Sequence, residues 1–305
     1  VDVYGPGIKL INLIIHDTGQ GIGAWNGASD SEYYGNVIFN NGWMSSDRGH
    51  GHGIYTQNQN GTKLYKNNFV FNNLGYGVHM YGSDQAFLNN FTWENNVLFN
   101  DAQLFGGGTP INNMVVKGNY FYANNFGLGY SNPYNNNISF TDNYLGAGII
   151  ALGLSKNVTV TGNTVVNNGR YVISLNLDAK PTNTISDYTI NNNIYYKPYS
   201  DVGEAFYIPS AYVPGSCSYW WFNKASKGYG YCKGSLASWQ EDLGYDLNSA
   251  YTDGMPTETK YFLKQNIYDS SRANITIFNW PKSNTVSVDV SSVLASGDSY
   301  ELRNV

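Results

Sequence analysis

Residues able to do acid–base chemistry gather in one short stretch of this chain. Segment 47–57 reads Asp-Arg-Gly-His-Gly-His-Gly-Ile-Tyr-Thr-Gln, which places Asp47, Arg48, His50 and His52 close together. A cation beside a sugar carboxylate acidifies the adjacent C–H bond, and an imidazole can take up the released proton. These residue types therefore suit elimination or epimerisation of a uronic acid.

Shorter copies of this stretch lie on either side of it. Segment 75–81 reads Gly-Tyr-Gly-Val-His-Met-Tyr, and segment 21–27 reads Gly-Ile-Gly-Ala-Trp-Asn-Gly. Each copy begins with glycine, any residue and glycine, followed by residues that alternate as in a β-strand. A strand that recurs in this way indicates a solenoid of stacked coils.

The alternation predicts which side chains of these copies face outward. Aligning the glycines places Trp25, Tyr55 and His79 in one outward file, with Gln57 and Tyr81 in the next. A flat file of aromatic rings and amides suits stacking on sugar rings and hydrogen bonding to them. The alternative is an ordinary outer surface of a Tyr-rich solenoid.

These positions define the expected site. The candidate catalytic residues are Asp47, Arg48, His50, Tyr55, His79 and Tyr81, and the candidate substrate-binding residues are Trp25, Trp43, His52 and Gln57. Arg48 is the expected cation, His50 or His79 the base, and a tyrosine the acid. Hydrolysis fits less well, because it needs two carboxylates and the outward files carry none. A structural Asp47–Arg48 turn remains an alternative.

The other histidines have plainer interpretations. His52 has inward parity and aligns with Tyr76 and Ile22, which favours a partly buried structural residue. His16 falls in register with Asn40 and is interpreted as a turn residue. A His-x-His pair with a distant histidine could bind zinc or copper, although no fourth ligand is visible.

A second repeat runs through the first two-thirds of the chain. Asparagine, then two or three β-branched or aromatic residues, recurs about every 25 residues. These segments begin at Asn12, Asn36, Asn68, Asn96, Asn119, Asn143, Asn163 and Asn193. Asparagine tolerates the left-handed conformation of turns and can bond to its neighbours above and below. The pattern predicts a parallel β-helix with stacked asparagines.

Composition agrees with an all-β chain and excludes several partners. Only 13% of the 305 residues are charged, 16% are aromatic, and the net charge is −5. A phosphate-binding face needs clustered Lys and Arg, and none is visible, so we expect no nucleic acid partner. No apolar run reaches about 18 residues, so no membrane span is expected.

The register of the repeat fails after Tyr196. We expect a parallel β-helix over 1–198, a loop-rich capping region over 199–260 and an antiparallel β segment over 261–305. In the capping region, Ser235 and Gly244 delimit a short predicted helix. In the last part, segments 274–280 and 285–290 alternate and are predicted to pair with each other.

Several weak signals point to an extracellular protein. Cys217 and Cys232 flank one loop and are predicted to form a disulfide. N-x-S/T sequons start at Asn60, Asn90, Asn137, Asn157 and Asn274. The chain opens at Val1 without a start Met and without a signal peptide, which suggests a processed or trimmed product.

The repeats and the run Arg48-Gly-His-Gly-His-Gly-Ile-Tyr-Thr-Gln-Asn58 resemble the right-handed parallel β-helix proteins of the pectate-lyase-like superfamily. They are most similar to secreted microbial parallel β-helix repeat proteins of unassigned activity. The likeness covers about residues 1–200, and segment 272–280 resembles their C-terminal β segment. It implies lyases, hydrolases and epimerases of polysaccharides, but also tailspikes and adhesins. The Asp triad of polygalacturonases and the calcium-binding acidic cluster of pectate lyases have no counterpart here.

The expected function is therefore an extracellular or cell-surface protein that acts on a polysaccharide, lyase- or epimerase-like on uronic acids. The alternatives are a non-catalytic carbohydrate-binding or surface protein, and a structural subunit that stacks end to end into a fibre. No cofactor is expected, and a metal ion such as calcium stays open.

Overall fold

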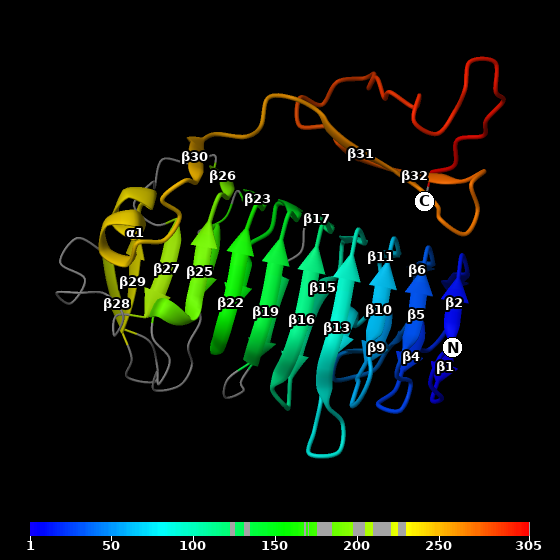
Figure 1. Cartoon of the computed structure of the whole chain (residues 1–305), viewed down its shortest axis with the longest axis horizontal. Coiled ribbons are helices and arrows are strands. Elements are labelled where there is room, and N and C mark those ends of the chain that lie inside the picture. Colours follow the sequence, from blue (N-terminus) through cyan, green and yellow to red (C-terminus); the bar gives the residue numbers. More distant parts are fainter. Residues whose placement is uncertain are drawn as a thin grey trace. The chain divides into compact units, whose positions relative to one another are not determined.

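The chain folds into a parallel β-solenoid built from three sheets. The computed structural model describes residues 1–122, 126–130, 135–167, 169, 171–175, 185–197, 205–209, 221–224 and 230–304. The chain divides into two compact units, Val1–Met255 and Pro256–Val305. Each coil of the first unit passes through sheet A, sheet B and sheet C in turn, and each strand pairs with its counterpart in the next coil (Figure 1).

The strands of each sheet follow one another in chain order along the solenoid, except that β29 precedes β28 at the end of sheet A. Sheet A contains β1 (Asp2–Val3), β4 (Ile22–Ala24), β9 (Ile54–Thr56), β12 (Tyr76–Met80), β15 (Ala102–Gly107), β18 (Phe126–Tyr130), β21 (Ile150–Leu152), β24 (Ile173–Leu175) and β27 (Phe206–Pro209), then β29 (Gly230–Gly234) and β28 (Trp221–Lys224). Sheet B contains β2 (Lys9–Ile11), β5 (Ser31–Tyr34), β10 (Lys63–Lys66), β13 (Leu88–Glu94), β16 (Ile111–Lys117), β19 (Asn135–Thr141), β22 (Ser155–Thr161) and β25 (Tyr188–Asn191). Sheet C contains β3 (Ile14–His16), β6 (Val37–Phe39), β11 (Phe69–Phe71), β14 (Val97–Phe99), β17 (Tyr120–Tyr122), β20 (Tyr144–Gly146), β23 (Thr164–Val166), β26 (Ile194–Lys197) and β30 (Ala250–Asp253).

Four more strands and two helices complete the described elements. They are the antiparallel pair β7 (Trp43–Met44) and β8 (Gly49–His50), the antiparallel pair β31 (Lys260–Gln265) and β32 (Ala273–Phe278), the 3₁₀ helix η1 (Ile185–Asp187) and the helix α1 (Leu236–Leu243).

Inward side chains of successive coils stack on each other in the core. In sheet B, Tyr65 is in register with Tyr33 and Trp93. Its ring stacks on both, with centroid distances of 4.6 and 4.0 Å. All three side chains are buried. Because the strands of neighbouring coils are only about 4.8 Å apart, identical positions meet directly, and flat rings fill this spacing well.

The predicted asparagine repeat forms a buried ladder at the turn between sheets B and C. Each Nδ2 donates to the Oδ1 of the next asparagine, as from Asn68 to Asn96 and from Asn96 to Asn119, both at 2.9 Å. The backbone N–H of Asn96 donates to the same Oδ1 of Asn119. The ladder, which we call the inner ladder, consists of Asn36, Asn68, Asn96, Asn119, Asn143, Asn163 and Asn193.

The inner ladder ends on a buried carboxylate held by the cap. Asp246 accepts hydrogen bonds from Asn193 Nδ2, from the Tyr195 hydroxyl and from Trp239 Nε1, at 2.9 to 3.0 Å. Trp239 lies on α1, whose predicted boundaries are confirmed: Ser235 caps its N-terminus, and Gly244 ends it with a φ of 68°. The Asp246 N–H bonds to the carbonyl of Ile190 in β25. The cap therefore continues the ladder chemistry beyond the last coil.

A second, shorter ladder runs at the turn that enters sheet A. Asn41 Nδ2 donates to Asn73 Oδ1 at 3.1 Å, and Asn73 Nδ2 donates to Asp101 Oδ2 at 2.9 Å. Burial raises the pKa of Asp101 to about 6. An acidic side chain thus occupies a place that asparagine fills elsewhere.

Two details of the sequence interpretation are wrong. His16 is in register with Phe39, not Asn40, and its ring stacks on Phe39 at 4.9 Å. The first turn is one residue out of step because Asp17 takes the left-handed turn position that Asn40 has in the next coil. The predicted partner of β32 is also wrong: β32 pairs with β31 before it, and segment 285–290 forms no strand. The predicted Cys217–Cys232 disulfide lies outside the described residues.

Removing one carboxamide from the inner ladder should be costly. Asn119→Ala removes the carboxamide that bonds Trp93 O and the backbone N–H and Nδ2 of Asn96 in a dry site. We expect a loss of about 4 kcal/mol in the free energy of unfolding, since each orphaned group costs about 1–3 kcal/mol. Asn112→Ala, which removes a surface amide bond to Asn89, should cost under about 1 kcal/mol. If urea titrations showed that both variants lose the same free energy of unfolding, the structural role of the ladder would be contradicted.

Replacing the acidic residue of the second ladder should stabilise the protein at high pH. The folded-state pKa of Asp101 is raised from 3.8 to about 6, so ionisation opposes folding. This cost is absent below about pH 4 and develops as the pH rises through 6. We expect Asp101→Asn to raise the free energy of unfolding at pH 8 by about 2 kcal/mol and to change it less at pH 4. A variant that is less stable than the native chain at pH 8 would contradict this.

Candidate functional site

The outward face of sheet A near the N-terminus carries a cluster of aromatic and imidazole rings. In the strands β9 and β12, Tyr55 and His79 are register partners, while Ile54 and Val78 are fully buried. The Tyr55 and His79 rings meet edge to face, with centroids 5.0 Å apart. The inward and outward parity of these strands is therefore as the alternation predicts.

Trp25 reaches the cluster by a different route from the one expected. The register partner of Tyr55 in β4 is Gly23, because Gly21, not Gly23, is equivalent to Gly53. A side chain at Gly23 would lie 3.2 Å from the Trp25 ring. The indole thus covers the position at which this glycine has no side chain. Its ring centroid lies 5.4 Å from that of Tyr55, and its Nε1 donates to Asp2 Oδ1 at 2.9 Å.

His52 faces the cluster and not the core. It precedes β9, so the alternation of that strand does not extend to it, and its predicted inward parity is wrong. It is opposite Tyr76 but not Ile22, whose register partner is Ile54. Its half-buried ring lies 4.3 Å from the His79 ring and 5.7 Å from the Tyr55 ring.

Hydrogen bonds fix the tautomers of both histidines. The backbone N–H of Tyr76 donates to His52 Nδ1 at 2.9 Å, so the His52 proton resides on Nε2. His52 Nε2 and His79 Nδ1 are 3.0 Å apart, which makes His79 Nδ1 the acceptor. The proton of His79 therefore resides on Nε2. His79 presents a hydrogen-bond donor, which makes it unsuited to act as a base through that atom.

Both histidines are held neutral. Burial is the main cause, and it lowers the pKa of His52 to about 4 and that of His79 to about 3. The nearby charge of Arg48 lowers both values further. The cluster therefore offers polar rings without charge at neutral pH.

The β7–β8 hairpin carries the charged groups. His50 Nε2 lies 2.9 Å from Asp47 Oδ1, and this hydrogen bond lowers the pKa of Asp47 to about 2. The carboxylate accepts the Nε2 proton, so the Nδ1 lone pair of a neutral His50 is available as a base. The His50 ring stacks on Trp43 at 4.4 Å. Arg48 is 75% exposed, with Nε 3.8 Å from Asp47 Oδ2.

Close contacts of glycine backbone hold this hairpin against the neighbouring coils. Gly51 has a φ of +78°, and a side chain there would collide with the carbonyl of Gly19. Gly49 approaches the carbonyl of Leu74 in the same way. Larger residues would push the hairpin away from sheet A, so the glycines of the motif have a positional role.

Tyr81 and Gln57 border the cluster on its other side. Gln57 Nε2 donates to the backbone carbonyl of Tyr81 at 3.0 Å, and the Tyr55 hydroxyl reaches the same carbonyl at 3.5 Å. The Tyr81 ring is exposed and lies 5.5 Å from the His79 ring. Burial raises the pKa of Tyr55, so its hydroxyl stays protonated at neutral pH.

Sequence reasoning missed a lysine beneath this site. Lys63 is fully buried, and its Nζ donates to the carbonyls of Ala24, Trp25 and Gln57. Burial lowers its pKa to about 7. The inward position of Lys63 in β10 could have indicated this role. The lysine ties the backbones of two coils together directly below Trp25 and Gln57.

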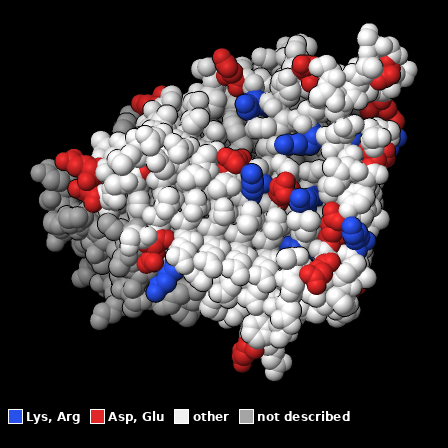
Figure 2. Space-filling view, viewed as in Figure 1, with Lys and Arg blue, Asp and Glu red and all other residues white. Residues whose placement is uncertain are grey.

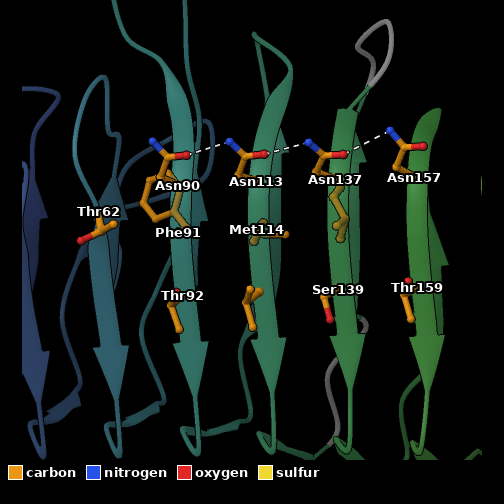
Figure 3. A pocket seen from close by; sticks show the side chains of 12 residues that line it. Thr62, Asn90, Phe91, Thr92, Asn113, Met114, Asn137, Ser139, Asn157 and Thr159 are labelled. Atoms are coloured by element: carbon orange, nitrogen blue, oxygen red, sulfur yellow. Dashed lines mark hydrogen bonds between the residues drawn. The ribbon is translucent and has the colours of Figure 1, made fainter.

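A second feature that was missed is a hollow of about 470 Å³ on sheet B, away from the sheet A cluster (Figure 3). It is lined by residues of β13, β16, β19 and β22. The sequence signal was present, since three of the sequon asparagines belong to it. Together with Asn113, these asparagines recur once per coil along the sequence.

The described residues include neither a candidate metal site nor a candidate membrane-spanning helix. No group of three or more His, Cys, Asp and Glu residues among them could hold a metal ion. None of their helices is long and apolar enough to cross a membrane.

Comparison with known proteins gives only a weak likeness in fold. No protein-family model and no curated protein matches the chain. Among solved structures, the chain is similar to QnrB1, a plasmid-mediated fluoroquinolone resistance protein, with 11% sequence identity and a TM-score of 0.31. The likeness covers 62% of this chain and 80% of that one. At this level it carries no argument about function.

The histidine pair should make stability depend on pH in a defined window. Both folded-state pKa values are lowered, to about 4 and 3, from 6.5. The unfolded chain therefore binds more protons below about pH 6.5, and stability is lost as the pH falls toward these values. We expect a lower urea midpoint at pH 5 than at pH 7. In the double variant His52→Gln, His79→Gln, the difference should be smaller.

Nitrogen-detected NMR provides the direct check of protonation and tautomer. Neutral Nε2–H rings for His52 and His79 are expected from pH 8 down to pH 5. Titration of either ring near its ordinary pKa would show that the cluster is hydrated and open.

Proposed function

We propose that the sheet A cluster and the β7–β8 hairpin bind and cleave, or epimerise, a uronic-acid polysaccharide outside the cell. The observation that carries this proposal is the arrangement of an exposed Arg48 and the Asp47–His50 pair beside the neutral His52–His79 pair. A cation, an oriented base and a neutral donor are the groups that β-elimination from a uronate needs.

In the proposed mechanism, the hairpin removes a proton. Arg48 binds the sugar carboxylate and stabilises the negative charge that develops on it. His50 takes the proton from the carbon next to the carboxylate through Nδ1, while Asp47 orients the ring through Nε2. His79 donates its Nε2–H to the same developing anion. The base is therefore assigned to His50, whereas residue types alone left His50 and His79 as alternatives.

The two reactions differ in what happens to the electron pair that remains on the carbon after His50 removes its proton. In elimination, the pair forms a carbon–carbon double bond, the glycosidic C–O bond breaks, and Tyr55 or Tyr81 protonates the leaving oxygen. In epimerisation, a proton returns to the opposite face of the same carbon. Trp43 is exposed and Trp25 is partly exposed, so both rings can contact neighbouring sugars. The likeness to pectate-lyase-like proteins supports this substrate class, as does the sequence evidence for secretion.

The test is the release of unsaturated uronates from polygalacturonate, alginate and glycosaminoglycans, followed by ultraviolet absorbance. Epimerisation is followed by incorporation of solvent deuterium. We expect Arg48→Gln and His50→Gln each to lower kcat/KM at least a hundredfold, since each removes a group that acts in the transition state. Trp25→Ala should mainly raise KM.

One matched variant controls for folding and charge. Lys66→Gln removes a cation of sheet B that pairs with Glu94, and it should leave turnover unchanged. Binding of acidic polymers without double-bond formation or deuterium uptake would favour a non-catalytic binding protein. Neither binding nor turnover with any acidic polymer would overturn the proposal.

A further inference from the structure

A shallow trough crosses four strands of sheet B, on a different sheet from the proposed catalytic cluster. Its lining residues include two parallel rows (Figure 3). The amide row consists of Asn90, Asn113, Asn137 and Asn157. The second row, two residues further along each strand, consists of Thr92, Val115, Ser139 and Thr159. The trough therefore runs across the strands, from coil to coil.

The shape of the trough comes from a bend in each strand. The four asparagines of the amide row have φ values of 54° to 59°, a left-handed conformation that interrupts an otherwise extended strand. The residues that follow them, among them Phe91 and Met114, point into the core and are buried. The side chains before and after the bend face outward, and the space between them is the trough.

The amides are ordered but not saturated. Asn113 Nδ2 donates to Asn90 Oδ1 at 2.9 Å, and Asn137 Nδ2 donates to Asn113 Oδ1 at 2.9 Å. A carboxamide has two N–H donors and two lone pairs. One N–H and one lone pair of Asn113 therefore remain for a ligand, and the same holds for Asn90 and Asn137, about 4.8 Å apart from coil to coil. Asn157 uses both N–H groups, on Asn136 and Asn137, and offers only its oxygen. Because the ladder already fixes the side chains, binding costs little side-chain entropy.

The trough carries no charge among its lining residues. Lys66, Glu94 and Lys117 form the next outward file beyond the second row, and on the other side the exposed Lys156 precedes Asn157 in β22. Lys66 is neutralised by an ion pair with Glu94 at 2.8 Å. Figure 2, viewed onto sheet B, shows white, uncharged side chains over the middle of these strands. An anionic polymer gains no charge attraction from the residues that line the trough. A neutral polymer rich in hydroxyl groups meets matching hydrogen-bond donors and acceptors.

We propose that the sheet B trough binds an unbranched, neutral polysaccharide chain lying parallel to the solenoid axis. Asn90, Asn113 and Asn137 each offer a carboxamide that can donate to a sugar hydroxyl and accept from one, and Asn157 offers an acceptor. The Thr methyl groups and Val115 offer apolar contact to the C–H faces of the rings. The advance per coil is close to that of one pyranose ring in an extended chain. This site is independent of the proposed function of sheet A.

Affinity electrophoresis through gels that contain hydroxyethylcellulose, glucomannan, xylan or polygalacturonate tests the proposal. The native chain should be retarded by at least one of the three neutral polymers. The double variant Asn113→Gly, Asn137→Gly removes two amides while keeping a residue that accepts positive φ. Val115→Arg places a long charged side chain across the trough. Each should weaken retardation at least tenfold.

Two controls separate this site from other effects. Thr141→Arg adds the same charge on β19 outside the trough, and Arg48→Gln alters only the sheet A cluster. Both should keep native retardation, and thermal unfolding should show all variants folded.

Four outcomes would overturn the proposal. These are no retardation by any neutral polymer, equal retardation of the trough variants, trough-dependent retardation by polygalacturonate alone, and inhibition of ice-crystal growth that Val115→Arg abolishes. Inhibition of ice-crystal growth would mean that the trough orders water molecules and does not bind a polysaccharide.

Discussion

The inner asparagine ladder is the constraint on which the solenoid depends. A coil that turns from sheet B to sheet C buries backbone groups that no strand can pair, and each would cost about 1–3 kcal/mol if left alone. One asparagine per coil bonds these groups and the asparagine of the next coil. The ladder works only if successive coils keep the same register. That register in turn fixes every file of side chains on the outer faces.

The candidate site uses this fixed spacing. Tyr55 and His79 meet because β9 and β12 are in register. Lys63 ties the coil of β4 to the coil of β9 through the carbonyls of Trp25 and Gln57. The groups to which we assign the proposed chemistry lie on the β7–β8 hairpin, an insertion between two coils. A rigid sheet thus supplies neutral rings, and a short insertion supplies the charges. Because the hairpin is held by glycine contacts, its position does not rely on large side chains.

Much of the fold followed from residue patterns because the ladder positions demand asparagine and little else. The patterns were less informative where a position tolerates alternatives. The glycine motif was placed two residues off at Gly23, since glycine suits both equivalent sites. His52 was assigned to the core because strand alternation was extended back beyond the start of β9. The sheet B trough was missed because its bend depends on a left-handed asparagine within a strand, which alternation does not reveal. The pairing of β32 was predicted wrongly because only 274–280 and 285–290 were recognised as alternating, whereas its partner β31 lies at Lys260–Gln265.

The most direct measurement for the site is a crystal structure of the His50→Gln variant soaked with a short oligogalacturonate. The account predicts a sugar carboxylate bonded to Arg48 and to His79 Nε2, with a ring stacked on Trp25 or Trp43 and the adjacent C–H facing position 50. An oligosaccharide bound with its carboxylate away from Arg48, or bound only elsewhere on the solenoid, would contradict it.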